Sequence, residues 1–185
     1  SVTVNGEVTT FDLQTLASLP GKIRAGDFEV EGVLLGERLV DIRPASQGSS
    51  AYGLAVDIGT TSVAVMLVDL ENGWIKGVES SLNEQVAYGF DVISRIDYSS
   101  KGSENLKELQ RRIVQGINQL IGQLCKEYRI VSGEIYEMVV VGNTTMMHLF
   151  LGLEAKNMAL SPYISATTNP HSLAAGELGI DIHPA

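Results

Sequence analysis

The chain has 185 residues, a net charge of −9 and a pI near 4.7, with 44% hydrophobic and 19% charged residues. These values are typical of a soluble globular protein with one principal domain and a smaller appended part. The 13 basic residues are scattered and form one doublet, Arg111-Arg112, so the sequence argues against a nucleic-acid-binding surface.

Cysteine content and hydropathy exclude further classes. The one cysteine, Cys125, permits no intrachain disulfide and cannot by itself hold a zinc ion or an iron–sulfur cluster. No run approaches 18 apolar residues, and residues 1–6 show no basic segment before an apolar one. We therefore expect a cytoplasmic protein that neither spans a membrane nor carries a signal peptide, with Cys125 as a buried, unreactive thiol.

Residues 1–44 predict a small β-rich module. A first hairpin is expected around Asn5-Gly6, because both central residues of such a tight turn must take positive φ. Residues 28–35 and 38–42 predict a second hairpin, with its turn at Gly36-Glu37.

A short helix is expected between these two hairpins. Asp12 is suited to cap its beginning, and Pro20-Gly21 predicts that it ends at Leu19. The segment 45–50 directly follows Pro44, contains Gly and Ser and shows no apolar periodicity, so it predicts a flexible linker between two domains.

The segment 51–185 predicts an α/β domain. Strands at residues 52–56, 63–70 and 74–80 are separated by tight turns, which favours an antiparallel meander. A continuous apolar run at residues 135–141 is typical of a strand in the centre of a sheet. Together these strands predict a mixed sheet.

Helices are expected between and after these strands. Asp91 is suited to cap a short helix, and Ser103 a longer one that runs to about Tyr128. Residues 144–151 predict a further helix, followed by a loop with one short helix near 172–178. The long helix carries one apolar stripe at steps of three and four, formed by Leu106, Leu109, Ile113, Ile117, Leu120, Ile121 and Leu124.

The turn Asp57-Ile58-Gly59-Thr60-Thr61-Ser62 carries the strongest chemical signal. Gly59 lets the backbone bend sharply, and Thr60, Thr61 and Ser62 offer hydroxyls beside a run of backbone N–H donors. Such a turn wraps phosphate oxygens, while Asp57 is placed to hold Mg²⁺ through water and to polarise an attacking water. An ordinary hairpin is the alternative, but the two flanking apolar strands favour the phosphate site.

A second candidate segment follows the strand at residues 135–141. Gly142 permits a turn, and Asn143 or Thr144 either caps the next helix or reaches toward the phosphates or the metal. Residues 146–148, Met-Met-His, are expected to pack in the core and its rim, because adjacent residues of a helix point in different directions and cannot chelate one metal.

The turn at Asp57 fits neither the Walker loop nor the Rossmann fingerprint. It resembles the first phosphate motif of the acetate and sugar kinase, heat-shock protein 70 and actin superfamily, whose lobes have a ribonuclease H-like fold. That superfamily closes its cleft with a second lobe, whose motifs are not found between Gly152 and Ala185. With no initiator Met, the chain is expected to be a fragment that binds ATP weakly or not at all by itself.

Two further segments narrow the resemblance. With Val-Gly-Asn-Thr-Thr-Met at 141–146 and the stretch 83–96, the chain is similar to the reductive activators of corrinoid-dependent enzymes. Those proteins carry a ferredoxin-like [2Fe–2S] domain, a linker, a small middle domain and an actin-like ATPase domain. The resemblance implies that residues 1–44 end the middle domain and that 51–185 begin the ATPase domain.

Within the stretch 83–96, the segment 88–96 has two interpretations. Asp91 and Arg95 either line the cleft or a partner surface, or Asp91 caps a helix and Arg95 lies on its exposed face. The sequence leaves both interpretations open.

The resemblance also implies a function. Such proteins use ATP to drive reduction of cob(II)alamin to cob(I)alamin on a corrinoid protein, with an electron from the ferredoxin domain. For this chain it implies ATP and Mg²⁺ as cofactors, a corrinoid protein as partner and the [2Fe–2S] cluster in a region before residue 1, and it leaves a homodimer open. A small-molecule kinase of the same superfamily and a non-catalytic nucleotide-binding module remain the alternatives.

Overall fold

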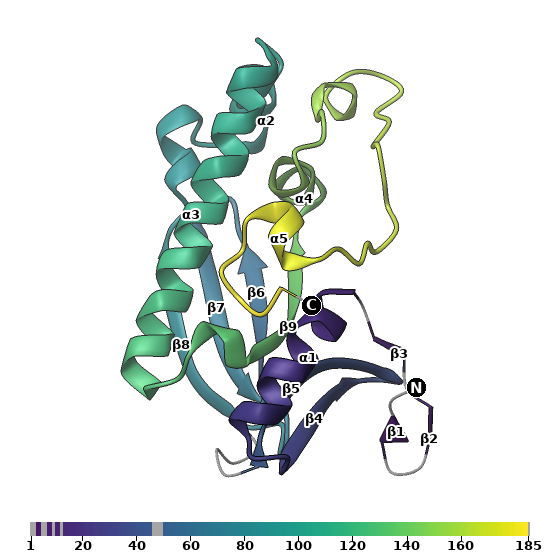
Figure 1. The fold of residues 1–185 in the computed structure, drawn as a ribbon. Coiled ribbons are helices and arrows are strands. Elements are labelled where there is room, and N and C mark those ends of the chain that lie inside the picture. Colours follow the sequence, from purple (N-terminus) through teal and green to yellow (C-terminus); the bar gives the residue numbers. More distant parts are fainter. Residues whose placement is uncertain (1–2, 5–6, 9, 12, 46–49, 185) are drawn as a thin grey trace. The chain divides into compact units, whose positions relative to one another are not determined.

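The computed structural model divides into two compact units, residues up to Ala51 and Tyr52–Pro184 (Figure 1). The residues that the structure describes are 3–4, 7–8, 10–11, 13–45 and 50–184. The predicted turn at Asn5-Gly6, the predicted cap Asp12 and most of the predicted linker therefore lie outside the described residues.

In its described residues, the first unit contains two small sheets and one α-helix. Its strands are β1 (Thr3–Val4), β2 (Glu7–Val8), β3 (Thr10–Phe11), β4 (Val30–Leu35) and β5 (Arg38–Pro44). β1 pairs with β2 in antiparallel fashion, and the second sheet has the order β3-β5-β4. The predicted hairpin of β4 and β5 is confirmed, and Gly36 adopts a left-handed φ of +61° in its turn.

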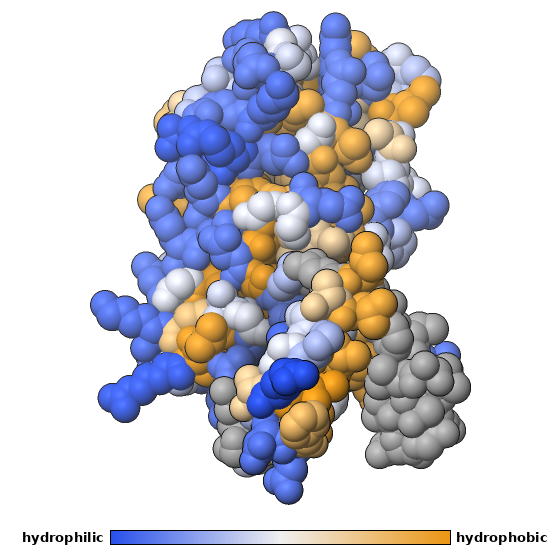
Figure 2. Space-filling view, viewed as in Figure 1, coloured by the Kyte–Doolittle hydropathy of each residue, from blue (hydrophilic) through white to orange (hydrophobic). Residues whose placement is uncertain are grey.

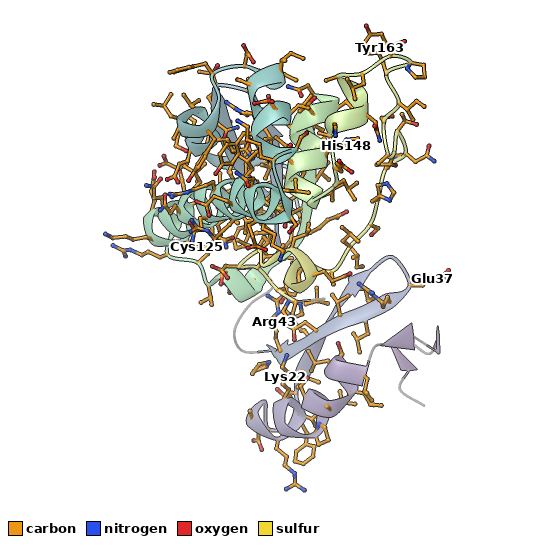
Figure 3. All side chains as sticks on the ribbon, turned by 90° about the horizontal axis from the view of Figure 1, so that it is seen from above. Lys22, Glu37, Arg43, Cys125, His148 and Tyr163 are labelled. Atoms are coloured by element: carbon orange, nitrogen blue, oxygen red, sulfur yellow. The ribbon has the colours of Figure 1, made fainter. Side chains whose placement is uncertain are left out.

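The helix of this unit, α1 (Leu13–Ala25), is longer than the sequence predicts. Pro20 lies inside it, although a proline removes one helical hydrogen bond and favours a helix end. Contacts with β5 hold both halves: the Thr15 hydroxyl donates to the Val40 carbonyl at 3.2 Å, and the Lys22 ammonium pairs with the Asp41 carboxylate (Figure 3 labels Lys22). The prediction that the helix ends at Leu19 is wrong because these contacts outweigh the local preference of proline.

The second unit is built on a four-stranded mixed sheet with the order β8-β7-β6-β9. Its strands are β6 (Tyr52–Ile58), β7 (Ser62–Asp69), β8 (Ile75–Leu82) and β9 (Ile135–Gly142). The first three form an antiparallel meander, and β9 lies parallel to β6. This arrangement confirms the predicted α/β fold of the ribonuclease H-like kind, in which a parallel strand joins the meander beside its first strand.

Helices of this unit cover one face of the sheet, with α3 running along its length (Figure 1). The helical elements are the 3-10 helices Glu84–Tyr88, Ser132–Glu134 and Lys156–Met158 together with α2 (Val92–Ser99), α3 (Ser103–Tyr128), α4 (Thr144–Leu151) and α5 (Ala175–Leu178). Asp91 caps α2 as predicted. Ser103, in contrast, is the first residue of α3, and the capping position belongs to Gly102, without a side-chain hydrogen bond. No helix in the described part of the chain is long and apolar enough to cross a membrane.

The core lies between α3 and the sheet. The predicted stripe is confirmed, because its side chains from Leu109 to Leu124 are at most 2% exposed, and Leu106 packs at the edge of the core. The outer surface of α3 is mainly hydrophilic (Figure 2). Leu54, Val56 and Ile58 of β6 point toward this core. Since successive side chains of a strand point to opposite faces, Asp57 points to the other, exposed face of the sheet.

Candidate nucleotide-phosphate site

The two predicted phosphate segments lie at the same edge of the sheet. β6 and β9 are parallel neighbours, with Asp57 opposite Val141 and Ile58 opposite Gly142. The turn that follows β6 and the turn that follows β9 therefore leave the sheet side by side. In this way the structure brings together residues that lie about 80 positions apart in the sequence.

The turn after β6 is tight and requires glycine at its first position. The Gly59 N–H donates to the Ser62 carbonyl at 2.9 Å. A Cβ atom at Gly59 would lie 2.8 Å from that same oxygen, closer than van der Waals contact allows. Gly59 is thus needed for the close approach of two backbone segments.

Three successive carbonyls of this turn accept hydrogen bonds from two residues of the protein. The Asn83 side chain donates to the Gly59 carbonyl at 2.8 Å, the Asn83 N–H donates to the Thr61 carbonyl at 2.8 Å, and the Arg95 guanidinium donates to the Thr60 carbonyl. In a trans peptide the N–H points away from the C=O. The N–H group that follows each carbonyl therefore points away from Asn83 and Arg95, which suits it to bind an anion.

Asp57 presents a carboxylate without internal partners. Its side chain is exposed on the face of the sheet opposite α3, where Val139 and Val141 of β9 are also exposed. Among the described residues it makes no hydrogen bond or ion pair. A carboxylate in this condition is available to accept hydrogen bonds from the water shell of a hydrated cation.

Asn143 joins the two segments through its side chain. Its Oδ1 accepts from the Met146 N–H at 3.0 Å and so caps α4, while its Nδ2 donates to the Thr60 hydroxyl at 3.2 Å. Of the two roles predicted for Asn143, capping is the one that the structure contains. Thr144, the first residue of α4, is exposed beside it. A direct contact of either residue with phosphate or metal stays a prediction.

Gly142 provides a test of how closely the two segments pack. A Cβ atom there would lie 2.8 Å from the Ile58 carbonyl, whereas a Cβ at Gly122 in α3 meets nothing within 4 Å. We expect Gly142→Ala to lower the free energy of unfolding by about 1–3 kcal/mol. The matched change Gly122→Ala is expected to raise it by about 0.5–1 kcal/mol, because alanine favours helix. Urea unfolding measures both, and a stabilising Gly142→Ala would show that the two turns are not in contact.

Arg95 is buried, which contradicts the interpretation that it lies on an exposed helix face. Its side chain is 0% exposed, and burial lowers the pKa of its guanidinium. Asp91 caps α2 in a capping box with Ser94, and the backbone hydrogen bond from Ser94 lowers the pKa of its carboxyl. Asp91 therefore has the capping role that the sequence offered as one alternative, while Arg95 faces inward.

Sequence reasoning missed the buried polar residues that support the turn. Asn83 and Gln85 are at most 1% exposed, and no role was predicted for either of them. A signal for Arg95 does exist in the sequence. Val92, Arg95, Ile96 and Ser99 follow the i, i+3, i+4, i+7 spacing of one helix face, and Arg95, Ile96 and Ser99 are buried.

The Met-Met-His segment packs in the core as predicted. Met146 is 0% and His148 is 1% exposed. The two ring nitrogens of His148 bond to backbone groups, Nδ1 to the Thr144 carbonyl at 2.8 Å and Nε2 to the Ala166 N–H at 3.0 Å. His148 thereby ties α4 to the loop that follows it, on whose outer end Tyr163 lies (Figure 3). Cys125 is half-buried in α3, and burial raises the pKa of its thiol.

Comparison with known proteins gives consistent matches. A family model described as the RACo middle region matches residues 52–185. The corrinoid activation enzyme RamQ of Eubacterium limosum is 36% identical over 193 aligned residues, which cover 95% of this chain and 32% of that protein. A solved structure of a reductive activator for corrinoid, iron-sulfur protein superposes with a TM-score of 0.81 at 37% identity, and the match covers 95% of this chain and 29% of that one. The chain thus spans about a third of the length of these relatives.

Proposed function

The chain belongs to the RACo middle region family, and from this membership we propose that it is part of an ATP-dependent reductive activator of a corrinoid protein. The proposed activity returns cob(II)alamin to cob(I)alamin on a partner corrinoid protein. The observation that carries the proposal is the turn at 57–62, whose outward N–H groups and free carboxylate suit a magnesium-bound polyphosphate. The names of the two relatives, a corrinoid activation enzyme and a reductive activator, support the assignment of this site to corrinoid activation.

In the proposed site, each group has a distinct task. The N–H groups of Thr60, Thr61 and Ser62 hold phosphate oxygens, with Gly142, Asn143 and Thr144 at the neighbouring turn. Gly59 contributes the shape of the turn and not a donor, because its N–H is bonded to the Ser62 carbonyl. Asp57 holds Mg²⁺ through water and orients the attacking water. The donors fit this ligand, since hard oxygen ligands suit Mg²⁺ and backbone N–H groups suit phosphate. Charge that develops on the transferred phosphoryl group is stabilised by these donors.

ATP is proposed to act on the corrinoid partner through protein conformation. Nucleotide binding shifts an equilibrium only by its differential affinity for two states of the activator, so the ATP-bound state must bind the partner differently from the free state. The reducing electron has to come from another part of the protein, because a [2Fe–2S] cluster needs four ligands and this sequence has one cysteine. We also propose that residues 1–44 end a middle domain, that 51–185 begin the ATPase domain, and that the protein acts in the cytoplasm.

The decisive experiment uses the full-length protein and its corrinoid partner in the Co(II) state. With a reductant present, we expect the Co(I) absorbance to appear when MgATP is added and not when a non-hydrolysable ATP analogue replaces it. Reduction at the same rate without nucleotide would refute the ATP dependence. Phosphorylation of a sugar or an acid by the same protein, without any cobalt reduction, would favour the kinase alternative instead.

A further inference from the structure

Arg95 is the largest of the fully buried side chains in the described residues. It reaches from α2 to three other parts of the unit. Its Nε donates to the Gly89 carbonyl at 2.8 Å, its Nη1 lies 3.3 Å from the Gln85 Oε1 and 3.2 Å from the Met146 sulfur, and its Nη2 donates to the Thr60 carbonyl. A single guanidinium thus contacts the phosphate turn, the 3-10 helix and α4.

None of these four partners carries a charge. They are two backbone carbonyls, an amide oxygen and a thioether sulfur. The nearby carboxylate that favours the charged form of Arg95 is Asp91, which is itself engaged in capping α2. An arginine stays protonated in proteins, and a buried cation without a directly bonded anion is costly. Among the described residues, no hydrogen-bond partner of Arg95 is therefore an anion, and Asp91 compensates its positive charge only through space.

We propose that Arg95 is a positioning residue that holds the phosphate turn and places a fixed positive charge behind it, so that a bound polyphosphate compensates this charge. The proposal rests on the proposed function of the turn. The Thr60–Thr61 peptide group lies between the two charges: its carbonyl accepts from Arg95, and its N–H points the opposite way. A hydrogen bond at one end of a peptide group polarises the other end, so Arg95 makes the Thr61 N–H a stronger donor to an anion.

Arg95 also fixes the second segment of the site relative to the first. The Met146 sulfur lies 3.2 Å from Arg95 Nη1 and 3.8 Å from Asn83 Nδ2, and the Met146 N–H is the group that Asn143 caps. Asn143 in turn donates to the Thr60 hydroxyl. Arg95, Met146, Asn143 and Thr60 therefore contact one another in a ring that joins both turns. Arg95 is the charged residue of these four.

The test separates the charge of Arg95 from its packing. Arg95→Lys keeps the charge and loses the planar fork of donors, whereas Arg95→Gln keeps an amide donor and loses the charge. Both variants are made in the full-length protein, and calorimetry gives the dissociation constants of MgATP and magnesium tripolyphosphate. Circular dichroism gives the melting temperature of each protein. Arg111→Gln, which removes an exposed cation of α3 that pairs with Glu108, is the matched control.

We expect Arg95→Gln to weaken tripolyphosphate binding by about tenfold or more, the scale of one lost charge-assisted interaction. Arg95→Lys is expected to retain most of the affinity even if both variants melt at the same lowered temperature. Arg111→Gln is expected to bind as the wild type does. If Arg95→Lys and Arg95→Gln lose the same affinity for tripolyphosphate, and the loss follows the decrease in melting temperature, the role of Arg95 is only structural and the proposal is overturned. Unchanged affinity in both variants would overturn it as well.

A measurement on the wild-type protein covers the case in which neither variant folds. With isotope-labelled arginine, the NMR signal of the Arg95 Nε–H is expected to shift when magnesium tripolyphosphate is added. A shift of the Thr60 and Thr61 backbone signals without a shift of Arg95 would reject the inference and leave the proposed function standing. If the wild type binds neither MgATP nor tripolyphosphate, the proposed function itself fails, and the two failures are thereby distinguished.

Discussion

Replacing Asp57 with alanine is expected to lower the kcat for ATP hydrolysis by the full-length protein at least about 100-fold, because a group that orients water and metal at the reacting phosphate is removed. The fold should persist, since the Asp57 side chain is exposed and bonds to none of the described residues. Phosphate release gives the rate, and circular dichroism confirms that the variant is folded.

Asp97 offers the control for this change. Its carboxylate is exposed on α2 and forms a surface ion pair with Lys101 at 3.0 Å. Asp97→Ala removes the same group outside the phosphate site, so its kcat should equal that of the wild type. Undiminished hydrolysis by the Asp57 variant, or an equal loss in both variants, would reject the role assigned to Asp57.

The second large effect is expected in the core. Ile117 is 0% exposed in the middle of α3, so Ile117→Ala should lower the free energy of unfolding by about 2–5 kcal/mol, through lost burial and the cavity left behind. Ile93 of α2 is 62% exposed, and Ile93→Ala should change the free energy of unfolding by at most about 0.5 kcal/mol. Urea unfolding compares the two identical substitutions. Similar costs would mean that α3 does not pack on the sheet as described.

The parts of the fold that the sequence predicted well are those with a strong repeating pattern. The stripe of α3 runs over about five turns of one helix, so a single misplaced residue could not hide its period of 3.6. The strand–turn–strand around Asp57 was equally clear, because Gly59 is bounded by apolar strands on both sides. Asn143 was predicted to cap α4 or to bind the ligand, and local chemistry at a helix start was enough to find the first role.

The parts that escaped prediction depend on contacts distant in the chain. Pro20 marks a helix end by its local chemistry, yet packing against β5 carries α1 past it. The helical spacing of Arg95 is compatible with an inward position, but its burial is stabilised by acceptors at positions 60, 85, 89 and 146. No pattern within one helix reveals such partners. The hydrogen bonds from Asn83 and Arg95 to the phosphate turn could therefore be identified only from the structure.

The parallel pairing of β6 with β9 has a consequence for how this chain reaches its folded state. The meander of β6, β7 and β8 pairs neighbours in sequence and closes short loops, so it is expected to form early. β9 pairs with β6 only after α2 and α3 have been synthesised. Until then one edge of β6 exposes unpaired backbone groups, which offer a template for the strands of other molecules. Aggregation of the nascent protein should therefore depend on how soon residues 135–142 are synthesised and pair with β6, rather than on the stability of the folded domain.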